Sequence, residues 1–173
     1  FDAATGTIGR QSSIATGLHI VAQDIARIER AVDNAEKPSR FLFSGRAEEL
    51  IYVLGERPGN NRAGVYWVRL LVRAGDGGAE LVRLRAPFQV GNVEPGLIDW
   101  ADEVVLLRGD FGIGFSYRAP RSGLRSWASN WEARNLLPEQ IKIEIRDLAT
   151  GRLRVPNFVT ALKIGAEAAC VWA

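Results

Sequence analysis

The sequence predicts an α+β fold in which one long N-terminal helix packs on antiparallel β-sheet. Two observations carry this prediction: an apolar seam with helical spacing in the first 38 residues, and a succession of alternating apolar and polar runs after residue 39. The chain has 173 residues, of which 47% are hydrophobic and 24% charged, enough for a core of its own. We therefore divide it into a helical segment, residues 1–38, and a globular β-rich head, residues 39–173.

The N-terminal segment carries the clearest helical pattern. Its apolar residues follow a 4-3-4-3-4 spacing, which places them in a narrow seam along one side of a helix. The seam consists of Ile14, Leu18, Val21, Ile25, Ile28 and Val32. We expect the helix to run from about Thr7 to Glu36 and to stop before Pro38, a length of roughly 45 Å. A compact domain of this size is about 35 Å across, so one end of the helix would project.

The rest of the chain is predicted to form strands separated by turns. The strongest signal is a hairpin at residues 65–88, where two alternating runs flank an Ala-Gly-Asp-Gly-Gly turn. Ile141 and Ile143 share the face of a later strand that we expect to be buried, and Pro138 suits the start of that strand because it lacks an N–H. The other expected strands are at residues 41–45, 49–55, 103–109, 112–119, 139–147 and 157–164, with a helical turn at 96–102.

Residue types suited to catalysis are scarce. His19 is the only histidine, and we interpret it as an exposed helical residue; Cys170 is the only cysteine, so no intrachain disulfide is possible. Zinc sites need more histidine or cysteine, and the acids at 94–103 lack the spacing of an EF-hand calcium loop. A carboxylate pair such as Asp99 and Asp102 is the remaining enzymatic interpretation. We predict no enzyme, no cofactor, no metal and no small-molecule substrate.

The charged residues are interleaved rather than clustered. There are 22 basic and 20 acidic residues, for a net charge of +2. A phosphate-binding surface is one interpretation of the arginines. We favour a solvated surface and no nucleic-acid partner, because acids or turn residues lie near every basic run.

Trp127 and Trp131 lie four residues apart, before the Leu137–Pro138 step. One interpretation is an exposed platform for a sugar or a single-stranded nucleic acid. The interpretation that we favour is that both side chains close an open end of the core.

Four stretches together resemble the minor pseudopilins of the bacterial type II secretion system, and among them the J-type subunits of the general secretion pathway. They are the N-terminal helix, the segment FLFSGRAEELIYVLGE at 41–56, the hairpin at 65–88, and the segment at 103–145. The last is the most specific, because a Leu-Leu-x-Gly strand, an aromatic-Tyr strand, tryptophans and a Leu-Pro step follow in an order similar to that of J subunits. The residues that make this order are Leu106, Leu107, Gly109, Phe115, Tyr117, Trp127, Trp131, Leu137 and Pro138.

The resemblance implies a pilin-like fold, with residues 1–38 as the soluble half of a pilin-type helix. It implies a structural role at the tip of the pseudopilus, with I-type and K-type minor pseudopilins as partners, in support of protein export across the outer membrane. The sequence begins at Phe1 and contains no methionine. We therefore expect an upstream apolar helix half that anchors the protein in the bacterial inner membrane by a single pass, with this domain in the periplasm.

The expected contacts divide along the seam. The candidate partner interface is Ile14, Leu18, Val21 and Ile25, with Ile14 and Leu18 foremost, because an apolar stripe beyond the head marks a partner site. The residues expected to pack in the core are Ile28, Val32, Trp127, Trp131, Pro138, Ile141 and Ile143.

Two other functions fit the same pattern. A type IV pilus minor pilin would share the helix and sheet, and neighbouring genes for pilus twitching instead of secretion would identify it. A periplasmic ligand-binding or lectin-like β domain would use Trp100, Trp127 and Trp131, and a glycan array or a tryptophan-fluorescence titration would identify it.

Overall fold

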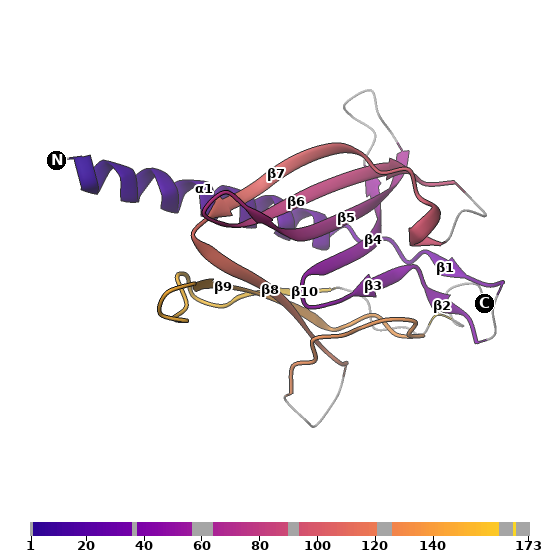
Figure 1. Cartoon of the computed structure of the whole chain (residues 1–173). Coiled ribbons are helices and arrows are strands. Elements are labelled where there is room, and N and C mark those ends of the chain that lie inside the picture. Colours follow the sequence, from indigo (N-terminus) through magenta and orange to yellow (C-terminus); the bar gives the residue numbers. More distant parts are fainter. Residues whose placement is uncertain are drawn as a thin grey trace.

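The computed structural model describes residues 2–35, 38–56, 64–89, 94–120, 126–162 and 168, with the side chains of the helix described from Ser13 onward. In this part of the chain one α-helix, α1 (Asp2–Ile25), is followed by ten strands in antiparallel sheets (Figure 1). The predicted architecture, a long N-terminal helix packed on a sheet, is therefore wrong: the protein is mainly β, and its helix ends at Ile25 instead of Glu36.

After the helix ends at Ile25, the apolar seam continues on extended backbone. Ile28 forms an isolated antiparallel bridge with Leu54. Val32 lies in the short strand β1 (Val32–Asp33), which pairs with β2 (Arg40–Phe41). Both side chains keep the helical spacing in the sequence but contact the core from non-helical backbone. Spacing alone therefore could not locate the end of the helix.

The larger sheet has five antiparallel strands in the order β3-β4-β5-β6-β7. The predicted hairpin is confirmed as β5 and β6, which are joined through Asp76 and Gly77, and Gly77 has a φ of +81° that favours glycine. The next glycine, Gly78, lets the end of β7 approach, because an added Cβ would collide with the carbonyl oxygen of Gly109. The strands are β3 (Phe43–Gly45), β4 (Glu49–Glu56), β5 (Gly64–Gly75), β6 (Gly78–Pro87) and β7 (Ala101–Gly109).

The smaller sheet has three antiparallel strands in the order β10-β9-β8. Its strands are β8 (Phe111–Arg118), β9 (Gln140–Asp147) and β10 (Phe158–Ala161), and a short 3₁₀ turn, η1 (Pro95–Leu97), precedes β7. The predicted alternation in β9 is confirmed, since Ile141, Ile143 and Ile145 are fully buried and the residues between them are not.

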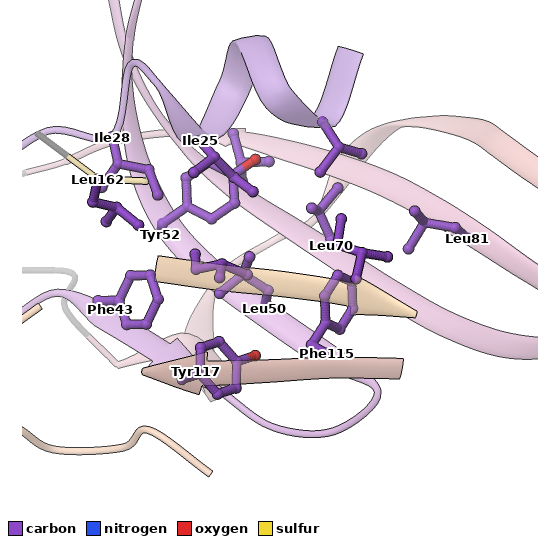
Figure 2. Packing of buried hydrophobic residues seen from close by; sticks show 14 of the residues in the cluster. Ile25, Ile28, Phe43, Leu50, Tyr52, Leu70, Leu81, Phe115, Tyr117 and Leu162 are labelled. Carbon is purple, nitrogen blue, oxygen red and sulfur yellow. The ribbon is translucent and has the colours of Figure 1, made fainter. Parts of the chain in front are cut away.

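The main core lies between the two sheets and against the C-terminal half of α1. Figure 2 shows Ile25 of the helix beside Tyr52 of β4, with Leu50 above Phe115 and Tyr117 of β8. Neighbouring side chains on β4 and β5 alternate faces, so a second, smaller cluster covers the opposite face of the larger sheet. This outer cluster consists of Leu42, Ile51, Val53, Trp67, Ala86 and Ile98.

Candidate partner-binding surface on the helix

The N-terminal half of α1 extends beyond both sheets, whereas its C-terminal half lies against them (Figure 1). The four residues predicted to contact a partner fall on the side of the helix that faces the domain. Ile14, Leu18, Val21 and Ile25 are at most 8% exposed and belong to the main core. Their contact with a partner stays a prediction.

The solvent-facing side of the described helix carries small and polar residues. Ala15, His19 and Gln23 are exposed, and Gln23 Nε2 donates to His19 Nε2 at 2.9 Å. His19 is thus exposed on the helix, as expected. Between Ser13 and Ile25, this is the side of the helix that a neighbouring molecule can reach without displacing the core.

Gly17 marks the closest approach of the helix to the larger sheet. A Cβ built on Gly17 would lie 2.5 Å from the carbonyl oxygen of Leu106 and would collide with the side chain of Leu107, both on β7. Any side chain at this position therefore pushes the helix away from the strand.

A buried polar cluster, Asp24, Arg83 and Tyr52, ties the last turn of the helix to the larger sheet. Arg83 Nε and Nη2 donate to the Asp24 carboxylate at 2.6 and 3.3 Å, and the Tyr52 hydroxyl donates to it at 3.2 Å. Asp24 is 6% exposed and Tyr52 fully buried. Burial, helped by the Asp24 charge, raises the pKa of Tyr52 well above its ordinary value. No local sequence pattern indicates this cluster, because Tyr52 and Arg83 lie 28 and 59 residues after Asp24.

The residues predicted to pack in the core lie as follows. Ile28, Ile141 and Ile143 are in the main cluster, Val32 is half-buried against it, and Pro138 is buried two residues before β9. These side chains hold the sheets together and take no part in an exposed site.

Trp127 and Trp131 have different environments. Trp131 is 3% exposed in the main core, and its indole N–H donates to Leu136 O at 2.9 Å. Trp127 is half-buried, with the Lys142 ammonium 4.9 Å and the Arg118 guanidinium 5.7 Å from its ring centre. They therefore do not form one exposed stacking platform.

A groove of about 560 Å³ lies on the outer face of the larger sheet. Trp100 lines it and lies 5.9 Å from the Arg69 guanidinium, which is itself paired with Glu49. Arg46 and Glu132 form a second ion pair on the rim at 2.7 Å. Because these charges are matched within the groove, its lining indicates no particular ligand charge.

The acids considered for catalysis or calcium are not gathered into a metal site. Asp102 pairs with Arg85 at 3.3 Å and Glu103 with Arg73 at 2.8 Å. Among the described residues, no group of three or more His, Cys, Asp or Glu side chains is placed to hold a metal ion. Cys170 lies outside the described residues.

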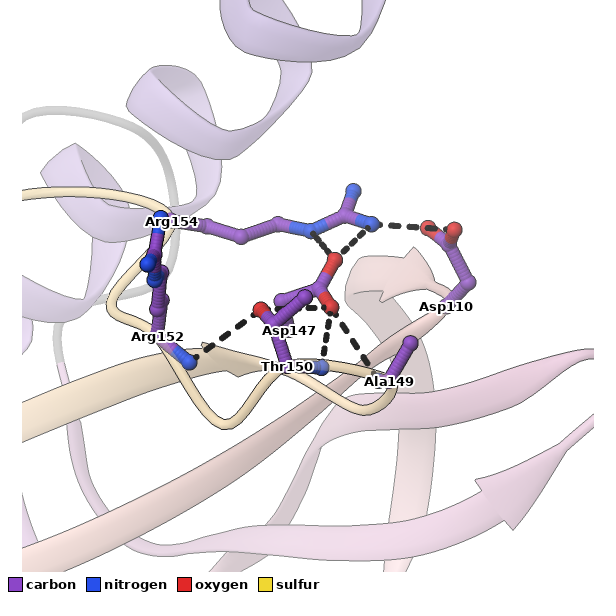
Figure 3. Close-up of polar contacts among 6 residues, drawn as sticks. All are labelled: Asp110, Asp147, Ala149, Thr150, Arg152 and Arg154. Carbon is purple, nitrogen blue, oxygen red and sulfur yellow. Dashed lines mark hydrogen bonds and ion pairs between the residues drawn. The ribbon is translucent and has the colours of Figure 1, made fainter.

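The turn after β9 is fixed by a second polar cluster (Figure 3). The Asp147 carboxylate accepts hydrogen bonds from the backbone N–H groups of Ala149 and Thr150 at 3.1 and 2.9 Å, and from Arg154 Nη2 at 2.8 Å. Arg154 also pairs with Asp110 at 2.9 Å. Hydrogen bonding by Arg154, and then by Thr150, lowers the pKa of Asp147 to about 2. All of these contacts stabilise the turn.

None of the helices in the described part of the chain has the length and apolar character needed to cross a membrane.

No family model and no curated relative matches the sequence. The fold, in contrast, is similar to that of a protein-secretion component. A chain of the solved structure "The Crystal Structure of the GspK-GspI-GspJ complex from enterotoxigenic Escherichia coli Type 2 Secretion System" matches with a TM-score of 0.58 and 14% sequence identity. The match covers 91% of this chain and 99% of that chain. At this identity the likeness shows the fold alone.

Proposed function

We propose that the protein is a structural minor pseudopilin of the type II secretion system, of the J type. One observation carries the proposal: the fold matches a chain of a complex of GspK, GspI and GspJ over nearly the whole of both chains. The order of motifs from Leu106 to Pro138, which is similar to that of J-type subunits, supports the same assignment.

In this role the protein acts by binding and catalyses no reaction. It joins I-type and K-type minor pseudopilins in the complex at the tip of the pseudopilus, which supports protein export across the outer membrane. A helical segment upstream of this domain anchors it in the inner membrane by a single pass, and the domain lies in the periplasm.

The helix is the proposed contact element, because it extends beyond the sheets (Figure 1). Ile14 and Leu18 already contact the core of their own domain, so a neighbour reaches the helix most directly through Ala15, His19 and Gln23. Ala15 has a small side chain, so a neighbouring helix can pack closely at this position.

Co-expression with the periplasmic domains of the I-type and K-type subunits from the same genome tests the proposal. We expect the three proteins to elute together in size-exclusion chromatography, and Ala15→Arg combined with Gln23→Arg to weaken the association at least tenfold. Leu148→Arg is the matched control, because Leu148 is 62% exposed and lies in the turn after β9 instead of on the helix.

Two results argue against the proposal. If this chain elutes alone while the I-type and K-type domains associate, it is not part of their complex. If it associates instead with minor pilins of a type IV pilus, the related pilus function is correct.

A further inference from the structure

The helix is held to the head at two points on its C-terminal half. At Gly17 its backbone lies against Leu106 and Leu107 of β7, and at Asp24 its last turn is bound by Arg83 and Tyr52. Gly17 and Asp24 are seven positions apart, which corresponds to roughly 10 Å along the helix axis. Two fixed points on a rod determine its direction, and the N-terminal half continues from them beyond the sheets (Figure 1).

The Asp24 contact joins three elements with directional bonds. Arg83 lies on β6 and Tyr52 on β4, so the carboxylate is bound from two strands that are separated by β5. The guanidinium contacts both carboxylate oxygens, which fixes the orientation as well as the distance. A rotation of the helix about its axis, or a tilt, breaks at least one of these bonds.

The cost of burying these charges indicates that stability is not their main contribution. The side chains of Arg83 and Asp24 are 12% and 8% exposed. A buried ion pair loses hydration that its attraction often only balances, and apolar residues of similar size are frequently as stable or more so. Apolar contacts are less directional than a bidentate ion pair, so they restrain the rotation and tilt of a helix less firmly.

We infer that Asp24, with Arg83 and Tyr52, is a positioning device that sets the direction in which the helix leaves the head. This direction would align the helix with neighbouring subunits, and that use of it rests on the proposed function. The direction itself is a property of the single chain.

A small error in direction is amplified along the projecting segment. Residues 4–17 span roughly 20 Å of helix. A tilt of about 10° at Gly17 therefore moves the backbone of residue 4 by roughly 3–4 Å, a large part of the roughly 8–10 Å between the axes of two packed helices.

Pulsed electron paramagnetic resonance measures this direction. Spin labels at Ala4→Cys on the helix and Leu97→Cys on the head, the latter 72% exposed, report their separation after Cys170→Ser removes the only native cysteine. The informative variant replaces the cluster with apolar residues: Asp24→Leu, Arg83→Met and Tyr52→Phe. Glu132→Gln is the control, because it removes an ion pair with Arg46 in which no residue of the helix takes part.

We expect a narrow distance distribution in the unmodified protein and in Glu132→Gln. In the apolar variant we expect the same or a higher unfolding temperature, with a distribution at least about 3 Å wider. A folded apolar variant with an unchanged distribution overturns the inference. If that variant does not fold, Arg83→Lys keeps the charge but loses the bidentate geometry, and it must widen the distribution for the inference to stand.

The same samples separate this inference from the proposed function. Failure of the unmodified chain to bind the I-type and K-type domains rejects the function and leaves the distances unaffected. Normal binding with an unchanged distribution in the folded variant rejects the positioning role alone.

Discussion

Replacing Gly17 with alanine tests whether close approach to β7 holds the helix in place. The added methyl group lies 2.5 Å from the carbonyl oxygen of Leu106, a backbone atom that cannot rotate away. The helix must therefore move outward by about 0.5–1 Å to restore an ordinary contact. On helix propensity alone, the same substitution should stabilise the protein by about 1 kcal/mol. The two effects have opposite signs, so the measurement decides between them.

The expected loss follows from the side chains that move with the helix. Ile14, Leu18 and Val21 are buried against the sheets, and each contributes about 2 kcal/mol. A gap of 0.5–1 Å forfeits roughly a quarter to a half of such contacts, or about 1.5–3 kcal/mol for the three. After the propensity gain, we expect a net loss of about 1 kcal/mol, which lowers the unfolding temperature by roughly 3 °C in a domain of this size.

Thermal unfolding followed by far-ultraviolet circular dichroism measures this change. Gly112→Ala is the matched control, because a Cβ there would meet only the Leu148 side chain at an ordinary 3.7 Å. We expect this control to unfold at the original temperature or slightly above it. If Gly17→Ala also unfolds at or above the original temperature, the close approach does not constrain the helix and the reasoning is refuted.

Three further predictions concern the head. The pKa of Asp147 is lowered to about 2, so the stability that its carboxylate gives the folded protein is present above its unfolded pKa of 3.8 and is lost as the pH falls toward 2. In Arg154→Met, carbon-detected NMR should show the pKa of Asp147 move up toward 3.8, and an unchanged pKa would contradict the role of Arg154. Trp131→Ala should destabilise the protein by about 3–5 kcal/mol in urea unfolding and Trp127→Ala by at least 2 kcal/mol less, and equal losses would contradict the burial difference. Burial raises the pKa of Tyr117, so the stability that its neutral side chain gives the folded protein is present below its unfolded pKa of 10 and declines above it. Tyr117→Phe should therefore leave the tyrosinate absorbance of the folded protein unchanged at pH about 11. A loss of absorbance in this variant would show that Tyr117 is ionised at that pH in the folded protein.

The strands could be predicted because their signals are local. Alternation over Ile141, Ile143 and Ile145 identifies β9 without knowledge of the rest of the chain, and the Asp76-Gly77 turn identifies the hairpin. The two-residue strands β1 and β2 carry no such signal. Their residues pair only because the chain after the helix lies beside the head.

The end of the helix and the Asp24 cluster could not be predicted, for different reasons. At Ile28 the apolar residues keep their helical spacing although the backbone has changed from helical to extended, so the periodicity does not reveal where the helix ends. Asp24 and Arg83 are 59 residues apart, and only tertiary structure brings them together. One sequence signal was available: Gly17 and Asp24 lie seven residues apart, on the same side of the helix as the apolar seam, where a glycine and an acid are unusual.

Burial of the seam changes which substitutions can test partner contact. Ile14→Asp or Leu18→Asp places a carboxylate in the main core, at a cost of several kcal/mol, so lost binding would not distinguish a partner contact from unfolding. Ile14→Val removes one methylene group and costs only about 0.5–1.5 kcal/mol, which leaves the head folded. If the seam contacts a partner directly, Ile14→Val should weaken that association measurably in calorimetry. If only the exposed side does, Ile14→Val binds normally and Ala15→Arg does not.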